Sequence, residues 1–489
     1  MALSKKVTSP SEVNRSEYSW EMMRRLLVPM VLFLAACGGA NENSENKANS
    51  QQPTSGAVAS TQPVEGQICA DLGARGTSAS QVELECQLMP DGLYVWRPPM
   101  NDPAQNSGAQ SGLQTVFGGG HECDPSGPTE YTSPTGDVTK FAYIYPLGGM
   151  IGTHITPIDH IYVYYPGAMS TSSKPANPAG TYLVTAPADG RVISVEDFQV
   201  GNNYPYPDYR ILIEHSCNLY SVFIHVGPLQ GPLEPIIAEM GSKGMWTGSI
   251  EVKSGEVIAD ESGQPGYDFS TFSDKHVVAL ANPDSYREAE NWKPYTSNPF
   301  DFFSGDVRSQ LEAKSLRVKE PLGGTIEWDL VGTARGSWFV KDSNGYRGLG
   351  SQGASFDNHG KVAHGYWDTH LALAPDAVDE SAFIFSIGDW EGCPCQFMSF
   401  GNSVDPATIK KSDQPTVIEL VDFEQVNADG SRMDPSRPTK GYRLRPGTGV
   451  VGVLALQVLD DNTMKVEKLP GTKASDFTGF SDKAVIYVR

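Results

Sequence analysis

Short apolar and alternating segments, separated by turn residues, follow one another along most of the chain after residue 135. Alternation of apolar and polar side chains is typical of strands with one buried face, and a short apolar run between turns is typical of a buried strand. In the first part of this region the segments are 137–145, 161–165, 180–186, 190–195, 210–225 and 252–259. The 50 glycines and 35 prolines supply the turns that such strands need. We therefore expect a mainly β protein with few long helices.

The last part of the chain is expected to form a separate all-β domain over residues 321–489. Its strand-like segments are 324–331, 337–340, 370–374, 382–387, 450–459 and 483–489. Several short strands at this spacing favour a barrel or a sandwich. Residues 286–320 are expected to link the two β regions. A short helix is predicted in this linker, with Ser304 as N-cap and with Val307 and Leu311 on one face.

The first 37 residues have the composition of a bacterial export signal. Arg24 and Arg25 precede the apolar run 26–34, which is too short to span a bilayer and leads into small residues and Cys37. Leu-Ala-Ala-Cys resembles a lipobox, so we expect lipidation of Cys37, translation from Met22, and attachment to the cell envelope. In a two-membraned cell, the glycine after the cysteine favours the outer membrane. A cleaved signal with an incidental cysteine is the alternative.

A polar tether and a cysteine-containing lead-in are expected to follow the signal. Residues 38–65 are nearly free of large apolar side chains and cannot bury enough surface to fold. Residues 66–135 hold three of the six cysteines beyond Cys37, an even number that suits disulfides in an oxidising compartment. The preferred local pair is Cys69 with Cys86. The chain has 58 acidic and 37 basic residues, which argues against a nucleic-acid partner.

Two features of the C-terminal region carry further candidate chemistry. Cys393 and Cys395 flank one proline and are too close for a relaxed bridge in most backbones, so they either pair elsewhere, form a strained, redox-labile link, or bind a metal. The second feature is a cluster of Asp357, His359, His364, Asp368 and His370. Its spacing matches no zinc pattern, so a polar surface loop is favoured over a metal site or a carbohydrate-stacking surface.

Ligand-type side chains also gather between residues 154 and 225. His154, Asp159 and His160 form one cluster, and His215 and His225 lie on a predicted hairpin. Histidine and aspartate are common zinc ligands, and a hydrolytic zinc site needs three protein ligands, an open position for water and a base. The alternatives are that the hairpin histidines bind backbone groups and that Asp159 closes a turn.

The order of segments around these clusters resembles the LytM-like, M23 family of zinc endopeptidases. The matching parts are the Asp159 region, Ala-Pro-Ala-Asp-Gly-Arg-Val at 186–192, the hairpin 211–225 and Lys-Ser-Gly-Glu-Val-Ile at 253–258. We place the corresponding domain at 136–285. The resemblance implies a duplicated hybrid motif, a β-barrel-like sandwich, in this domain.

The same resemblance assigns roles to the clustered residues. In that family a histidine and an aspartate four residues later bind zinc, and a late His-x-His supplies the third ligand and a catalytic histidine. A hairpin histidine supports the transition state in that family. Asp159 fits a ligand position, and His225 fits the position of the hairpin histidine. His154 precedes Asp159 by five residues, so Ile155 occupies the expected ligand position. The strand 266–272, which should carry His-x-His, contains no histidine.

Two histidines are candidates to replace the missing ligand. His160 is adjacent to Asp159, and neighbouring strand residues point to opposite faces, so the two share a site only across a bend. His276 lies just beyond the strand that should carry the motif. We therefore expect any zinc ligands among His154, Asp159 and His160, with His225 as the candidate catalytic residue.

Two functions from different classes follow. We favour a lipid-anchored envelope protein whose degenerate M23-like domain is non-catalytic, needs no cofactor and binds or regulates at the cell wall. Peptidoglycan, a polysaccharide or an envelope protein would be its partner. The alternative is an active zinc-dependent peptidoglycan endopeptidase with a rearranged ligand set. Loss of the third ligand together with the base favours the first function.

Overall fold

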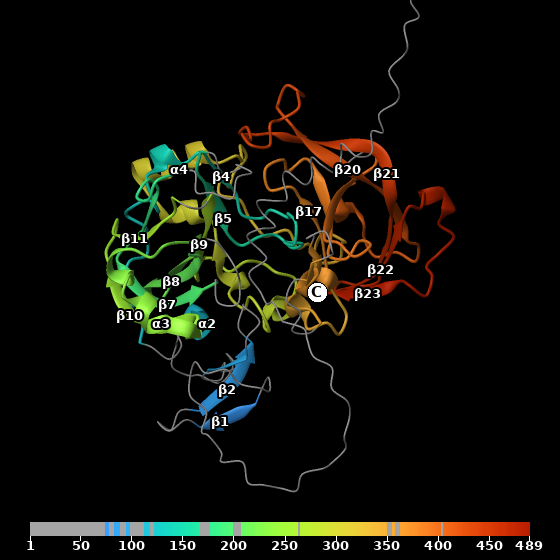
Figure 1. Cartoon of the computed structure of the whole chain (residues 1–489). Helices are drawn as coiled ribbons and strands as arrows, with labels where there is room; N and C mark the ends of the chain where they lie inside the picture. The colour runs from blue at the N-terminus through green and yellow to red at the C-terminus, as the bar shows by residue number, and fades with distance from the viewer. Residues whose placement is uncertain are drawn as a thin grey trace, which may run out of the picture.

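The computed structural model describes most of the chain after residue 121 and parts of the segment before it (Figure 1). The described residues are 74–77, 83–88, 94–97, 112–117, 122–166, 177–198, 207–262, 265–349, 355–356, 362–401 and 404–489. The signal region 1–37 with Cys37, the tether 38–65 and Cys69 lie outside these ranges. Among the described residues, no helix has the length and apolar character needed to cross a membrane.

The first large unit, here called the sheet unit, contains an eight-stranded antiparallel sheet. Its strands run in the order β10-β7-β8-β9-β12-β5-β4, with β13 paired to β12. They are β4 (Tyr143–Tyr145), β5 (Ile161–Tyr164), β7 (Gly190–Asp197), β8 (Tyr209–Ser216), β9 (Leu219–Val226), β10 (Met245–Val252), β12 (Gly266–Ser273) and β13 (Thr296–Ser297). A smaller sheet pairs β6 (Leu183–Thr185) with β11 (Val257–Asp260). The predicted hairpin over 210–225 is confirmed as β8 and β9.

The second large unit is a closed barrel, which decides between the two predicted architectures for the C-terminal region (Figure 1). Its strands are β14 (Gly336–Val340), β17 (His370–Pro375), β18 (Phe383–Ile387), β19 (Cys395–Ser399), β20 (Thr416–Val426), β21 (Arg443–Val458), β22 (Thr463–Pro470) and β23 (Val485–Val488). Two further small sheets join β1 (Arg75–Thr77), β2 (Glu83–Leu88) and β3 (Tyr94–Arg97), and β15 (Ser355–Phe356) with β16 (Val362–His364). The chain is therefore mainly β, as the hydrophobic pattern predicted.

The helices in the described part of the chain are short. They are α2 (Gly112–Phe117), α3 (Ile236–Met240) and α4 (Gly305–Lys314). The helix predicted in the linker is confirmed as α4, with Leu311 buried and Val307 packed against the core of the sheet unit. Ser304 occupies the N-cap position, but its side chain makes no capping hydrogen bond.

Two strand predictions were wrong, and both failures have a local cause. Within 137–145 only β4 is a strand, because Asp137 accepts a hydrogen bond from the Thr139 amide and caps a short 3-10 turn. Within 324–331 no strand forms, and the Thr325 hydroxyl accepts a hydrogen bond from the Glu327 amide of the same segment at 3.1 Å. Side-chain acceptors of this kind compete with strand pairing for the backbone.

The two faces of the large sheet pack against different parts of the molecule. One face carries the main core of the sheet unit, which includes Val163 and Phe269. The opposite face of the large sheet, here called the outward face, has two apolar halves. Helix α2 covers one of them through Leu113, and Tyr145 and Tyr162 in the other pack against residues of the barrel. The sheet unit and the barrel are thus joined by a shared hydrophobic cluster.

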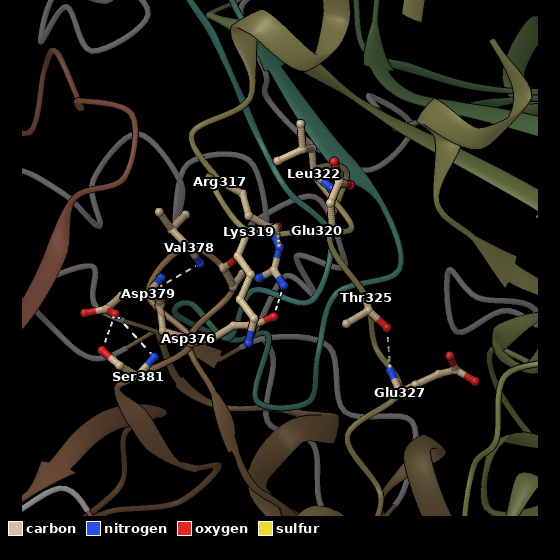
Figure 2. A network of polar contacts seen from close by, with 12 residues as sticks. Arg317, Lys319, Glu320, Leu322, Thr325, Glu327, Asp376, Val378, Asp379 and Ser381 are labelled. Carbon is tan, nitrogen blue, oxygen red and sulfur yellow. Dashed lines mark hydrogen bonds and ion pairs between the residues drawn. The ribbon is translucent and has the colours of Figure 1, made fainter. Parts of the chain in front are cut away.

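A buried arginine also fastens the linker to the barrel (Figure 2). The Arg317 side chain is fully buried, and its guanidinium donates to the carbonyl oxygens of Ala377 at 2.7 Å and Lys319 at 2.8 Å. It also forms an ion pair with Glu380, which Lys319 contacts as well. We call Arg317, Lys319, Glu380 and the loop 376–381 the Arg317 hub. Its partners come from the linker and from the loop between β17 and β18, so it holds these two segments together.

The described cysteines are paired. Cys123 bonds to Cys217 across 94 residues, and Cys393 bonds to Cys395. Of the three alternatives for the Cys393 and Cys395 pair, the structure therefore shows the link between the two. Cys86 is also disulfide-bonded, with its partner outside the described residues.

Candidate functional site

The bend that precedes β5 brings two of the sequence-predicted residues together on the outward face of the sheet. Asp159 and His160 both lie in this bend, and His160 Nδ1 is 3.0 Å from Asp159 Oδ1. The bend removes the conflict between neighbouring side chains, because strand alternation starts only at Ile161. His160 then lies beside the Tyr162 ring, with ring centroids 4.8 Å apart.

Asp268 connects His160 to His225. Its Oδ2 atom is 3.3 Å from His160 Nε2 and 3.9 Å from His225 Nε2. Asp268 lies on β12, between β5 and β9, and its neighbours Tyr267 and Phe269 enter the core, so alternation places Asp268 on the outward face. This is the strand in which the resemblance predicted His-x-His. A carboxylate therefore lies on the strand where the family pattern places imidazole.

His225 has an unusual backbone conformation that aims its ring at a second carboxylate. Its φ angle is +63°, in the left-handed region that non-glycine residues rarely adopt. The change of direction lets Phe223 and Val226 both enter the core, although simple alternation would place them on opposite faces. His225 Nδ1 is then 3.1 Å from Oδ2 of Asp208, a fully buried residue just before β8.

The first residues of the linker bind Asp159 from the other side. Trp292 Nε1 donates to Asp159 Oδ2 at 2.9 Å, and the Lys293 ammonium lies 3.8 Å from the same oxygen. Lys293 also binds Glu290 Oε2 at 2.8 Å, and its side chain is only 4% exposed. We call this set the histidine network: Asp208, His225, Asp268, His160, Asp159 and Lys293.

Charges alternate along the histidine network. Burial alone would lower the pKa of both histidines, but the carboxylates outweigh it. The Asp208 carboxylate raises the pKa of His225 to about 9, and Asp268 with Asp159 raises the pKa of His160. Burial opposes ionisation of Asp159, yet the adjacent ammonium and His160 hold its pKa well below the usual range. Each buried cation therefore has a buried anion beside it.

The other histidines that the sequence offered as candidates are not part of the histidine network. His154 packs its ring edge-on against His160, with centroids 5.8 Å apart, and desolvation lowers its pKa to about 3. His215 is a buried hairpin residue whose two ring nitrogens contact Asp189 O and Ser221 Oγ, the role foreseen as the alternative to chemistry. His276 is exposed and pairs with Glu327, which follows the linker in the sequence.

The donor set of the histidine network fits a zinc ion poorly. No group of three His, Cys, Asp or Glu side chains in the described part of the chain is arranged to hold a metal. Asp159, an expected ligand, already faces a tryptophan N–H and a lysine ammonium, and a cation beside Lys293 would be repelled. His160 and His225 each contact two carboxylates. The lysine supplies the positive charge that a metal would bring.

The ligand-type cluster of the barrel is likewise occupied by internal contacts. His364 Nδ1 is 3.0 Å from Asp368 Oδ2, and both side chains are accessible to solvent. His370 is buried, its Nε2 lies 2.8 Å from a backbone carbonyl, and burial lowers its pKa to about 3. Asp357 and His359 lie outside the described residues. The described members thus form two separate local contacts.

A surface pocket of about 370 Å³ opens where the sheet unit meets the residues after the linker, and no residue of the histidine network lines it. Its walls include Leu147, Val278 and Ile326, and Lys275 and Glu327 bring charges of both signs. At its side, the Thr296 hydroxyl group is buried and has no hydrogen-bond partner. An unpaired buried hydroxyl costs free energy, which a polar ligand atom would recover once the Thr296 side chain turned toward the pocket.

Comparison of the chain with protein-family models, with curated proteins and with solved structures finds no match. The resemblance to the M23 family therefore stays a prediction based on motif order. The fold itself is defined by an open antiparallel sheet joined to a closed eight-stranded barrel.

Proposed function

We propose that this protein is a lipid-anchored, non-catalytic binding protein of the bacterial cell envelope, with a sheet unit derived from an M23-like duplicated hybrid motif. The observation that carries the proposal is the Lys293 ammonium beside Asp159. In a zinc hydrolase this carboxylate would bind the metal, whereas here it has a permanent cation from its own chain. Asp268 replaces imidazole on β12 and completes a closed set of ion pairs, which supports loss of hydrolysis with retention of the scaffold.

The ligand is proposed to bind away from the histidine network. Asp159, His160, His225 and Asp268 are all buried. Their outward face is flanked by Trp292 and by the hydrophobic cluster shared with the barrel. A polymer strand would have to displace these contacts to reach the network. This argues against the face that carries the histidine network as the binding surface.

The pocket beside Thr296 is the better candidate for the ligand site. It combines apolar walls with a lysine, a glutamate and an unpaired hydroxyl, which suits a small zwitterionic or polar group on an apolar frame. The peptide stems and sugars of peptidoglycan have this chemistry. A volume of about 370 Å³ accommodates a fragment of that polymer and not several repeating units.

The test is binding of the full chain to soluble peptidoglycan fragments, measured by calorimetry with metal analysis of the same sample. Thr296→Val and Lys275→Gln are expected to weaken binding about tenfold each, equivalent to about 1.4 kcal/mol. Lys253→Gln, which changes an exposed lysine in an ion pair with Asp189, is the matched control and should leave binding unchanged. Unchanged binding in the pocket variants would reject the pocket. Stoichiometric zinc with chelator-sensitive cleavage would instead support the endopeptidase alternative.

A further inference from the structure

The Cys393 and Cys395 pair lies at the base of a tight turn between β18 and β19. Glu391 and Gly392 both have left-handed backbone conformations, with φ angles of +52° and +81°. Trp390 N donates to Cys393 O at 2.8 Å, and Cys393 N donates to Trp390 O at 3.2 Å, which closes the turn. Cys395 is the first residue of β19 and pairs with Ile387 of β18. The backbone around the two sulfurs is therefore held by hydrogen bonds independent of the S–S bond.

The two described disulfides differ in what they hold together. Cys123 and Cys217 are 94 residues apart and tie the lead-in to the hairpin of β8 and β9. Cys393 and Cys395 are separated by two positions and connect no distant parts of the chain. In the chain-entropy model the stabilisation from a disulfide grows with the length of the loop it closes. The short link therefore contributes least to folding, and the barrel is expected to keep its fold when that link is open.

The surroundings of the pair suit a bond that opens and closes. Both cysteines are only half-buried, which gives an incoming thiolate access to the sulfurs. Cys393 Sγ lies 3.1 Å from the Trp390 carbonyl oxygen, so a thiol at this position has a hydrogen-bond acceptor already in place. Exposed disulfides are the ones that exchange, whereas structural disulfides resist reduction.

We propose that Cys393 and Cys395 form a reversible redox site that undergoes thiol–disulfide exchange with a protein dithiol. A thiolate of the dithiol attacks Cys395 Sγ, the S–S bond breaks, and its electron pair leaves on Cys393 sulfur, which takes up a proton. In the mixed disulfide, Cys395 is bonded to the first cysteine of the dithiol protein. The second thiolate of the dithiol protein then attacks the sulfur of that first cysteine and releases Cys395, which takes up a proton. The protein gains two electrons and two protons, and the dithiol becomes a disulfide.

Hydrogen bonds connect the residue next to Cys395 with the sheet unit, so reduction of the disulfide is expected to affect that unit. Gln396, next to Cys395, donates from Nε2 to Gly152 O at 2.9 Å and accepts from Gly152 N at 3.2 Å. Gly152 is two residues before His154, whose ring packs against His160 of the histidine network. Opening the disulfide is expected to weaken the two hydrogen bonds between Gln396 and Gly152 and to raise hydrogen exchange in the Gly152 loop.

The experiment titrates the full chain with mixtures of reduced and oxidised dithiothreitol, followed by alkylation and mass spectrometry of each cysteine peptide. Cys393 and Cys395 are expected to be half reduced at a ratio of reduced to oxidised reagent at least about 100-fold lower than Cys123 and Cys217 require. Circular dichroism should show the fold intact at that point. Equal ratios for the two disulfides, or reduction of Cys393 and Cys395 only after denaturation, would overturn the proposal.

Two variants separate exchange from general accessibility. Cys393→Ser leaves Cys395 as a single thiol. The added dithiol protein has its resolving cysteine removed and its remaining cysteine linked to thionitrobenzoate, so attack by the Cys395 thiolate should release thionitrobenzoate and trap a stable mixed disulfide. The matched control is Cys395→Ser, which should trap at least tenfold less if attack is directed to Cys395. Equal trapping by the two variants would reject the assigned direction of attack. The titration of the unmodified chain does not depend on the folding of either variant.

Discussion

The histidine network and the Arg317 hub are both buried clusters of charge, but they are built from different cations. The network relies on two histidines and a lysine, whereas the hub uses a guanidinium that also binds two backbone carbonyls. Arginine stays charged at every accessible pH, while histidine changes charge near neutrality. The hub is therefore a permanent connection, and the network is the part of the molecule whose charge responds to its surroundings.

Removing the hub cation is expected to have the largest effect. Arg317→Met leaves Glu380 without its buried partner and two carbonyl groups without a donor, which should lower the free energy of unfolding by about 3–5 kcal/mol. Urea unfolding monitored by fluorescence measures the change. The control is Arg445→Met, which removes an exposed pair with Glu424 and should cost about 1 kcal/mol or less. Similar losses in both variants would contradict the special role of the hub.

Removing the network cation is expected to cost somewhat less. Lys293→Met deprives Asp159 of its ammonium, but Trp292 and His160 still bind that carboxylate, so we expect a loss of about 3 kcal/mol. The companion variant Asp159→Asn should recover part of this loss when combined with Lys293→Met, because the buried charge is then absent. Strictly additive losses in this double-mutant cycle would show that the two residues do not interact.

The network, unlike the hub, predicts a pH dependence. The folded pKa of His225 is about 9, above the ordinary value near 6.5, so its stabilisation is fully present below about pH 6.5. It is lost as the pH rises through 9, and linkage gives a decrease of up to roughly 3 kcal/mol in unfolding free energy. His160, whose pKa is also raised, acts in the same direction. Urea unfolding from pH 6 to 9.5 measures this, and His225→Gln should flatten the profile.

Most of the fold could be predicted from the hydrophobic pattern. The hairpin of β8 and β9, helix α4 and the all-β C-terminal region follow from local periodicity and capping residues. Closure of the barrel could not be predicted, because it depends on pairing β14 with β23, which are far apart in the sequence. The predicted strands at 137–145 and 324–331 failed where a side-chain oxygen, of Asp137 and of Thr325, bound a backbone amide of the same segment.

The candidate site could be predicted only in part. Asp159, His160 and His225 were marked by residue type, but the groups that decide their chemistry were not. Asp268 lies in an ordinary strand sequence, and Trp292 reaches Asp159 across 133 residues. Such partners come together only through tertiary packing, which no local spacing reveals. The signal in the sequence is the alternation of this strand, which places the Asp268 carboxylate on the outward face.

Substitution of His154 is expected to have the smallest effect, and it tests directly whether this histidine acts as a zinc ligand. As a zinc ligand it would be essential, but here its ring packs against His160 and its pKa of about 3 keeps it neutral. His154→Gln should therefore change the unfolding free energy by about 1 kcal/mol or less and should leave the pH profile intact. His225→Gln, by contrast, removes the partner of Asp208 and should cost more. If His154→Gln lowered the unfolding free energy more than His225→Gln does, or changed the metal content, the result would support the zinc hydrolase alternative.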